Sequence, residues 1–248
     1  MNPIVECRGL WKAYHERNQL GVKDFLLRRG RARKYDKYSR AWALQDVNFQ
    51  VQPGEAFALV GHNGSGKSTL LSLLLGSIQP DRGTARLAKR IGSLLELGAG
   101  FHPDLTGREN AFLYGTILGM SLHEMRERFD SIVEFSELGE AVEHPIRTYS
   151  AGMIARLGFA IIIHTPAEVL LIDEVLAVGD AQFKEKCFDR LMHFKQQGGA
   201  LVITSHELEQ LPKICERGMC IDQGLVVAIG PVQEVLSHYR ALIGISNK

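Results

Sequence analysis

Residues 61–69 are the part of the sequence whose types and spacing best suit chemistry on a phosphate group. They fit the pattern G-x-x-x-x-G-K-[ST] and read Gly61, His62, Asn63, Gly64, Ser65, Gly66, Lys67, Ser68 and Thr69. Because glycine tolerates backbone conformations that a β-carbon forbids, successive N–H groups of such a loop can point at phosphate oxygens. We expect Lys67 to reach the β- and γ-phosphates of a nucleoside triphosphate and the Ser68 hydroxyl to be a ligand of Mg²⁺.

The segments on either side of this phosphate loop have the patterns that the motif requires. Ala56–Val60 is an apolar run of strand length, and Leu70–Leu75 continues the chain as an apolar helix that is expected to stop at Gly76. The positive end of that helix would add to the attraction for phosphate. A glycine-rich turn that matches the pattern by chance is the alternative, and the strand–loop–helix context argues against it.

A second chemical feature is a pair of acids at the end of an apolar run. Residues 169–172 are Val-Leu-Leu-Ile, which is typical of a buried parallel strand, and Asp173 and Glu174 follow them. Asp173 comes 106 residues after Lys67. Ligands of open α/β sheets bind at the carboxyl ends of the strands. We therefore expect Asp173 to orient the Mg²⁺ shell and Glu174 to accept a proton from the water that hydrolyses a nucleoside triphosphate.

Ser150 and Gly152 stand just before an apolar helical pattern at Ile154–Ile163. Serine is a favoured N-cap residue, worth ~1 kcal/mol, and the amino end of a helix can also hold a phosphate. The cap alone is the simpler interpretation of an isolated Ser-x-Gly. The position of Ser150, 23 residues before Asp173, favours an additional role at the nucleotide.

The order of these features along the chain resembles that of the ATP-binding cassette (ABC) family of transporter ATPases: the phosphate loop, the Ser-Gly pair, the apolar strand with its two acids and a later histidine. The resemblance extends over essentially the whole chain. The family signature, usually Leu-Ser-Gly-Gly-Gln, stands here as Tyr-Ser-Ala-Gly-Met at residues 149–153. Asp180 corresponds to the aspartate of the family's D-loop, which acts at ATP. His206 corresponds to its switch histidine, so the resemblance implies a catalytic role for His206 beside Glu174.

The resemblance also points to an aromatic residue and to a metal ligand. Tyr14 occupies the place of the aromatic residue that stacks on adenine, with Trp42 as the rival aromatic. Residues 93–110 occupy the place of the Q-loop, and their later half resembles the family closely. The expected glutamine is missing, and Glu96 is the nearest candidate. A glutamate can still hold Mg²⁺ or a water molecule, which makes Glu96 an additional expected metal ligand.

Between Tyr14 and the strand that begins at Trp42, residues 15–41 form an insertion that members of the family usually lack. Within it, residues 28–40 carry seven basic side chains and one acid, and Phe25-Leu26-Leu27 precedes them. The segment could be an amphipathic element close to anionic lipid head groups. It could equally be a solvated surface insertion.

The insertion and the run Leu-Leu-Glu-Leu-Gly-Ala-Gly-Phe-His-Pro at residues 94–103 are similar to the ATPases of polysaccharide exporters. The resemblance implies the ATPase subunit of an exporter that moves an O-antigen-like polymer on a polyprenyl lipid across the inner membrane. A teichoic-acid, polyol-phosphate or capsule exporter is the alternative. The implied location is the cytoplasmic face of the inner membrane, with a multi-spanning permease as partner and lipid-linked polysaccharide as the permease's substrate. Because the sequence ends at Lys248, we expect no appended carbohydrate-binding domain.

The family geometry further implies a homodimer that buries two ATP molecules. One chain holds the phosphate loop and the signature on different lobes. Each nucleotide would therefore lie between the phosphate loop of one chain and Ser150 and Gly152 of the other. Closure on ATP and opening after hydrolysis would be the power stroke, with ATP and Mg²⁺ as cofactors.

Composition argues against several other classes of protein. The chain has 29 Lys+Arg and 28 Asp+Glu, so its formal charge of +1 disfavours a protein that coats nucleic acid, and we expect no nucleic-acid partner. Its longest apolar run, Leu157–Ile163, is far shorter than the ~20 residues of a membrane-spanning helix. Four cysteines without a CxxC pair are expected to be reduced and mostly buried.

Two other nucleotide-hydrolysing classes are less consistent with the sequence. A soluble cassette ATPase acting on nucleic acid or ribosomes is the different-class alternative, but the second cassette or long coiled-coil insertion of that class is missing. A P-loop GTPase needs a guanine-reading Asn-Lys-x-Asp, and the Asn-Lys pair of this sequence is its last two residues.

The elements that must position these residues alternate between strands and helices. We predict strands at about 43–51, 56–60, 91–95, 169–172, 200–204 and 217–230. Between about 99 and 165, helical patterns such as Glu109–Met120 and Leu122–Glu137 replace strands. The predicted fold is an α/β P-loop ATPase core of the ABC type with an N-terminal β-rich region. Its expected parts are a core lobe at about 1–98 and 166–248, an inserted helical subdomain at about 99–165 and the basic insertion at 15–41.

Overall fold

The computed structural model describes residues 2–15, 40–87, 90–95, 98, 100–173, 179–205 and 208–244. Its strands are β1 (Val5–His15), β2 (Arg40–Val51), β3 (Ala56–Val60), β4 (Arg82–Leu87), β5 (Ile91–Ser93), β6 (Val169–Asp173), β7 (Ala200–Thr204), β8 (Arg217–Asp222) and β9 (Leu225–Pro231). Its α-helices are α2 (Lys67–Leu74), α3 (Gly107–Ile117), α4 (Leu122–Ser136), α5 (Ala151–Ile163), α6 (Ala181–Gln196), α7 (Leu211–Ile214) and α8 (Val232–Leu242). The insertion predicted at 15–41 lies outside the described residues except at its two ends.

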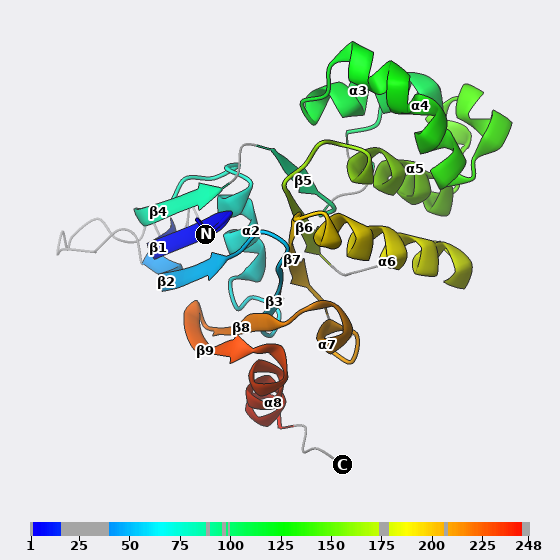
Figure 1. Cartoon of the computed structure of the whole chain (residues 1–248). Coiled ribbons are helices and arrows are strands. Elements are labelled where there is room, and N and C mark those ends of the chain that lie inside the picture. Colours follow the sequence, from blue (N-terminus) through cyan, green and yellow to red (C-terminus); the bar gives the residue numbers. More distant parts are fainter. Residues whose placement is uncertain are drawn as a thin grey trace, which may run out of the picture.

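The strands form two sheets (Figure 1). The larger sheet has the order β5-β6-β7-β3-β8-β9 and is parallel except for the antiparallel pair of β8 and β9. The smaller sheet is antiparallel and has the order β2-β1-β4. Because β3, β6 and β7 are parallel neighbours, their carboxyl ends meet at one edge, which is the edge where ligands bind in open α/β sheets.

The residues of β3 show why the larger sheet lies between two packed layers. All five are buried. Side chains alternate between the two faces of a strand, and so Phe57 and Leu59 pack into one hydrophobic cluster while the three alternate residues pack into a second. A strand covered on both faces needs a continuous apolar run of this kind.

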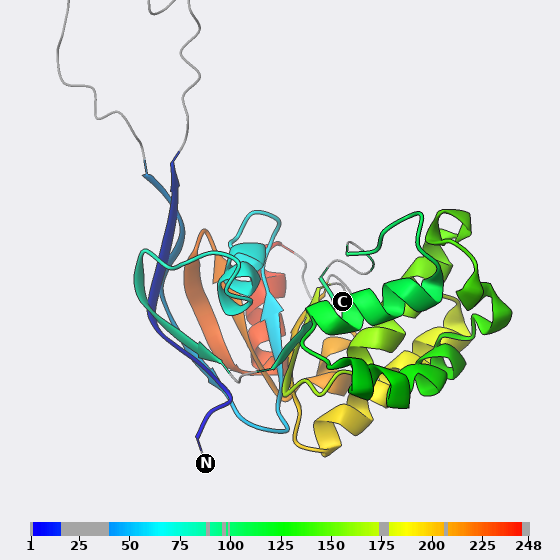
Figure 2. The same ribbon diagram turned by 90° about the horizontal axis from the view of Figure 1, so that it is seen from above.

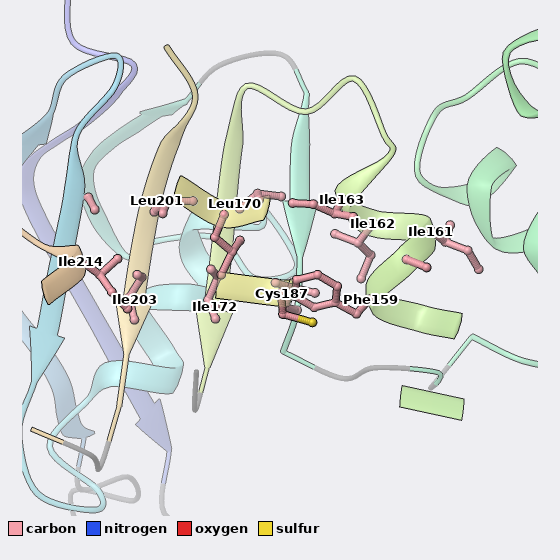
Figure 3. Close-up of a cluster of buried hydrophobic side chains, with 14 of the residues drawn as sticks. Phe159, Ile161, Ile162, Ile163, Leu170, Ile172, Cys187, Leu201, Ile203 and Ile214 are labelled. Atoms are coloured by element: carbon pink, nitrogen blue, oxygen red, sulfur yellow. The ribbon is translucent and has the colours of Figure 1, made fainter. Parts of the chain in front are cut away.

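Different elements cover the two faces of the larger sheet. One face packs against the smaller sheet and α2, whose four buried leucines each contribute about 1.5–3 kcal/mol of burial free energy. The other face packs against α6, α7, α8 and the second half of α5. Figure 3 shows part of this second cluster, which includes Ile172 and Ile203 of the sheet and Phe159 and Cys187 of the helices. On the first face, burial of its leucines fixes α2, the helix that follows the phosphate loop, against the sheet.

The helices α3, α4 and α5 lie together, away from the smaller sheet, in both views (Figures 1 and 2). Both α3 and α4 begin with a capping box, in which a Ser or Thr N-cap and a Glu three residues later satisfy each other's main-chain amides. The helices predicted at Glu109–Met120 and Leu122–Glu137 are confirmed with small shifts at their ends. Within the described ranges, no helix combines the length and the apolar character needed to cross a membrane.

One predicted strand is wrong, and β1 and β4 lie where no strand range is predicted. Residues 217–230, predicted as one strand, form β8 and β9, and the chain reverses at Gln223 and Gly224, whose φ angles are 46° and 79°. No strand is predicted at Arg82–Leu87, because Arg-Gly-Thr-Ala-Arg-Leu lacks an apolar run, yet main-chain pairing with β1 makes it β4. The α/β architecture, the helical group and the N-terminal β-rich region are confirmed.

All four cysteines are free and buried, which confirms their predicted burial. Burial raises the pKa of the Cys7, Cys187 and Cys215 thiols to about 12 and that of Cys220 to about 11. These groups therefore stay protonated at neutral pH, and a protonated thiol is a poor nucleophile.

Candidate functional site

The phosphate loop, residues 61–69, connects the end of β3 to the start of α2. Two glycines make its tight path possible. Gly61 has a φ of 154° and Gly66 a φ of 115°, conformations that residues with a β-carbon rarely adopt. A β-carbon added to Gly66 would lie 2.5 Å from the Ala43 oxygen, and one added to Gly61 would lie 2.5 Å from Ser65 Oγ. The loop can therefore wrap this closely only with glycine at both positions.

The amino end of α2 meets the loop without a side-chain cap. Its N-cap is Gly66, which has no side chain that could accept a hydrogen bond from the first helical N–H groups. The first N–H groups of a helix have no acceptor within the helix, and the helix dipole makes this end positive. An anion with several oxygens, such as a triphosphate, supplies the acceptors that these groups need.

Lys67, the first residue of α2, folds back over the loop. Its Nζ donates to the main-chain oxygens of Gly61 at 2.7 Å and His62 at 3.0 Å. Burial lowers the pKa of the Lys67 ammonium, and the nearby Asp173 and Cys220 act in the opposite direction. A phosphate group would be a stronger partner for this cation than two carbonyl groups are, because both members of the pair would be charged.

Asp173 ends β6 and pairs in register with Thr204 at the end of β7. The Thr204 hydroxyl donates to Asp173 Oδ1, and Thr204 is 1% exposed. This bond orients the carboxylate, which has further acceptor positions for another partner. Sequence reasoning missed Thr204, since only the register of two strands distant in sequence places it here. Its position two residues before His206 was the available signal.

These elements enclose a cleft of about 350 Å³. Its walls come from β1, β2, the phosphate loop and β6, and the lining residues are Tyr14, Ala43, Asn63, Gly64, Gly66, Lys67, Ser68, Thr69 and Asp173. Eight of these nine are residues that the sequence singled out, and Ala43 is the addition. Gly61, His62 and Ser65 belong to the same loop without lining the cleft, and His62 Nε2 lies 2.8 Å from Asp222 Oδ1.

Tyr14 and Trp42, the two rival aromatic residues, have different surroundings. Tyr14 lines the cleft, is 46% exposed and has Lys12 Nζ 5.9 Å from its ring centroid. Trp42 packs edge-on against Trp11 with centroids 5.1 Å apart, and the Arg82 guanidinium lies 5.7 Å from its ring. An exposed ring beside the phosphate loop can stack on a base, whereas the Trp42 ring is engaged in side-chain packing.

Ser68 and Asp173 place a hydroxyl and a carboxylate on the wall of the cleft. Mg²⁺ prefers oxygen ligands and is commonly held by one or two protein groups together with substrate phosphates, so this pair fits Mg²⁺. Among the described residues, no group of three or more His, Cys, Asp or Glu side chains could hold a metal ion. Glu96, the third predicted metal ligand, lies outside those residues, as do the predicted catalytic residues Glu174 and His206.

Ser150, Gly152 and Asp180 do not line this cleft. Ser150 is the N-cap of α5 and accepts from the Met153 amide at 3.2 Å, which confirms the N-cap interpretation. Asp180 is the N-cap of α6 and accepts from the Phe183 amide at 3.0 Å. The Ser-Gly pair therefore does not contribute to the phosphate-loop cleft of its own chain, which agrees with the separation of α5 from α2 in both views (Figures 1 and 2).

Comparisons with known proteins agree on the family of the site. The family described as ABC transporter matches residues 44–177. An O-antigen export system ATP-binding protein of Klebsiella pneumoniae, RfbB, is 42% identical over 97% of this chain and 98% of its own length. The teichoic acids export ATP-binding protein TagH of Lactiplantibacillus plantarum is 40% identical over 81% of this chain and 55% of its own length. A solved structure of an ATP binding subunit of an ABC transporter, 21% identical, covers 99% of this chain and 95% of its own with a TM-score of 0.75, which confirms the predicted fold class.

Proposed function

Because this chain belongs to the ABC transporter family and is an ATP-hydrolysing subunit of that family, we propose that it energises the export of a polysaccharide carried on a polyprenyl lipid. The proposal is supported by the 42% identity with an O-antigen export ATP-binding protein over 97% of this chain and 98% of the relative. The similarity thus includes the regions outside the phosphate loop, where subunits that serve different substrates have room to differ.

In this proposal the cleft holds the triphosphate of ATP. The loop and the amino end of α2 receive the phosphate oxygens, Lys67 neutralises charge on the β- and γ-phosphates, and Tyr14 stacks on adenine. Ser68 and Asp173 hold Mg²⁺, which supplies further neutralisation of phosphate charge when it is bound. All four side chains line one cleft, which supports their assignment to one nucleotide.

Glu174 is the proposed general base for hydrolysis. Its carboxylate accepts a proton from water as the water oxygen attacks the γ-phosphorus, the bond from phosphorus to the β–γ bridging oxygen breaks, and ADP and phosphate form. Thr204 supports this chemistry indirectly, since its hydroxyl orients Asp173, the residue before Glu174. We assign a catalytic role to His206 and a place in the metal shell to Glu96 on the resemblance alone.

Two copies of the chain would complete the site as a sandwich. Ser150, Gly152 and Asp180 lie outside the cleft of their own chain, at the amino ends of α5 and α6. Helix amino ends attract phosphate, and Ser150 and Asp180 are exposed. These groups can therefore close over a nucleotide held by a second chain, so that ATP draws two chains together and hydrolysis releases them.

Export also requires a path through the membrane. We infer that a separate multi-spanning permease supplies this path and binds the chain at the cytoplasmic face of the inner membrane. The helical subdomain proposed at about 99–165 would pass the closing motion to the permease. This assignment is supported by the position of α3, α4 and α5, which carry Ser150 and stand apart from the smaller sheet.

Export of a teichoic acid or another polyol-phosphate polymer is the second candidate function. It is favoured by the 40% identity with TagH, which extends over 81% of this chain and 55% of TagH. Because this match omits more of both proteins than the match with RfbB does, export of an O-antigen-like polymer is better supported.

Deletion of the gene in its source organism tests the proposal. We expect surface polysaccharide to be lost and lipid-linked polymer to accumulate inside the cell, and the wild-type gene but not Glu174→Gln to reverse both defects. The composition of the accumulated polymer, sugar or polyol phosphate, distinguishes the two candidate substrates. Unchanged surface polymers after deletion would overturn the export function. That result would not bear on the ATPase activity, which is measured separately on the purified chain.

A further inference from the structure

Arg156 of α5 connects three elements that are separate in sequence. It follows the N-cap Ser150 by six residues, and its side chain is 19% exposed. Its Nη1 donates to Glu137 Oε2 at 2.8 Å, and its Nη2 donates to Asp180 Oδ2 at 2.7 Å. One guanidinium therefore joins the body of α5 to the end of α4 and to the N-cap of α6.

The surroundings hold this guanidinium in one orientation. Its central carbon lies 4.6 Å from the ring centroid of Phe183, which is fully buried. Glu137 is also bound by Lys186, whose Nζ lies 2.9 Å from Oε1. Arginine presents its N–H groups in a rigid planar fork, and a lysine ammonium on a flexible stem does not reproduce that geometry. The site is thus built for an arginine that binds two carboxylates at once.

Charges within this network are matched. The amide of Phe183 and the charge of Arg156 lower the pKa of the Asp180 carboxyl. Hydrogen bonding to Lys186, with a further contribution from Arg156, lowers the pKa of Glu137. Both acids are therefore ionised at neutral pH. Because the Glu137 and Asp180 side chains are 41% and 64% exposed and are screened by solvent, the main effect of the network is to fix geometry.

The position of the network relative to the cleft suggests what that geometry is for. Ser150 and Asp180 begin two different helices, and neither lines the cleft of its own chain. Both are assigned above to the nucleotide of a second chain. The bodies of α5 and α6 pack in one hydrophobic cluster, but Ser150 and Asp180 at their amino ends are exposed. A direct link close to these ends reduces their freedom to move relative to each other, so that both groups can reach that nucleotide together.

We propose that Arg156 is a positioning residue that keeps Asp180 and the amino end of α5 at a fixed spacing, so that both reach the partner chain's nucleotide together. This role depends on the sandwich dimer proposed above. Arg156 itself makes no contact with ATP in this scheme. Loss of the fork should therefore weaken ATP-driven dimer formation and leave nucleotide binding by a single chain unchanged.

The test uses the full chain carrying Glu174→Gln, in which hydrolysis does not compete with association. ATP binding is measured on dilute single chains, and ATP-driven dimer formation is measured by analytical ultracentrifugation. For Arg156→Gln we expect ATP affinity within about twofold of the parent and a dimer dissociation constant raised at least about tenfold, as for the loss of a hydrogen bond to a charged group. Arg156→Lys, which keeps the charge and loses the fork, should give an intermediate increase.

Arg108→Gln is the matched control. Arg108 forms a comparable forked ion pair with Glu143, with Nη2 at 2.6 Å from Oε1, and its guanidinium lies 4.2 Å from the Phe129 ring centroid. The Arg108 side chain is 47% exposed, against 19% for Arg156, so its loss should lower the melting temperature less and leave dimer formation within about twofold. Glu137→Gln, which keeps the pair between Arg156 and Asp180, should likewise leave the dimer intact.

Two results would overturn the positioning role. The first is a dimer dissociation constant within about twofold of the parent for both Arg156 variants. The second is a loss of single-chain ATP affinity as large as the loss of dimer formation, which indicates a merely structural role. If melting curves show that Arg156→Gln does not fold, Arg156→Lys decides the question, with Glu137→Gln as its control. A parent that forms no dimer with ATP would remove the sandwich itself and the positioning role with it. The parent alone gives that result, so the two failures are distinguishable.

Discussion

The phosphate-loop cleft and the amino ends of α5 and α6 are built in opposite ways. In the cleft, residues from the end of a buried strand, a glycine-constrained loop and an anchored helix line one open depression. At the amino ends of α5 and α6, Ser150 and Asp180 are exposed, and each is engaged as a helix cap. The first region is a cleft within one chain, whereas the second presents helix amino ends, which attract phosphate, on an outer surface.

In the proposed dimer, this difference predicts that nucleotide binding and dimer closure are separate steps that involve separate regions. Interactions present before the reaction set the affinity for ATP, and interactions gained only on closure increase turnover. Changes in the cleft should therefore alter the ATP affinity of a single chain. Changes at the ends of α5 and α6 should have an effect only when two chains meet.

Glu174→Gln should give the largest change and separate the two steps most clearly. We expect turnover to fall by ~10²–10⁴-fold, the usual contribution of a general base. ATP binding should persist because the proposed contacts of Lys67 and Mg²⁺ with the nucleotide do not involve Glu174, so the variant should accumulate as a closed dimer. Phosphate release measures the first effect and size-exclusion chromatography with ATP the second. Near-normal hydrolysis would remove Glu174 from its assigned role.

Ser150→Ala tests the outer region directly. In a closed dimer the lost hydroxyl is a contact to a charged phosphate, worth about 1.5–3 kcal/mol, and so turnover should fall by about 10–100-fold. The ATP affinity of single chains should not change, because Ser150 lies outside their cleft. Fluorescence titration of dilute protein and steady-state phosphate release measure the two quantities. A weakened ATP affinity in single chains would contradict the separation of the two regions.

Ser121→Ala is the control for the loss of a helix cap. The Ser121 hydroxyl caps α4 by accepting from the Glu124 amide at 3.2 Å, as the Ser150 hydroxyl accepts from the Met153 amide, and it also donates to the Glu124 carboxylate at 2.9 Å. Both variants should lose a similar ~1 kcal/mol of stability, which thermal melting measures. Only Ser150→Ala should lose turnover. An equal loss in the two variants would mean that helix stability, and not contact with phosphate, explains the result.

The cleft could be predicted from the sequence because most of its chemistry is local. Residues 61–69 are adjacent, and the two acids directly follow an apolar run. Thr204 could not be predicted in the same way, because its place beside Asp173 depends on the register of β6 and β7. The network around Arg156 depends on how three helices pack, and no local pattern encodes that.

The same reasoning explains which strands could be predicted. β3 and β6 are buried on both faces, so their residues form apolar runs that stand out in the sequence. β4 has mostly exposed side chains and forms through main-chain pairing with β1, for which residue type carries little information. Gly224 is the sequence signal for the turn between β8 and β9. The apolar residues on both sides of the turn nevertheless favoured the prediction of one continuous strand.

Tyr14→Ala should weaken ATP binding by single chains by ~1–3 kcal/mol, the contribution of one base–aromatic stack. Trp42→Ala is the control, because Trp42 packs against Trp11 and does not line the cleft. It should lower the melting temperature and leave ATP affinity unchanged. The reverse pattern, with weakened binding in Trp42→Ala alone, would show that the adenine lies against the other aromatic residue.

Thr204→Val should give the smallest effect and tests whether a residue behind the cleft lining contributes to the metal site. The substitution keeps the shape of the side chain and removes the hydroxyl that orients Asp173. Because a typical hydrogen bond contributes about 0.5–1.5 kcal/mol, we expect the Mg²⁺ concentration for half-maximal hydrolysis to rise by about 2–10-fold. Thr165→Val is the matched control, since Thr165 is also buried and its hydroxyl donates to the Ile162 oxygen at 2.7 Å, outside the cleft lining. Both variants should lose comparable stability, but only Thr204→Val should change the Mg²⁺ requirement. An equal Mg²⁺ requirement in the two variants would mean that Asp173 needs no orientation by β7.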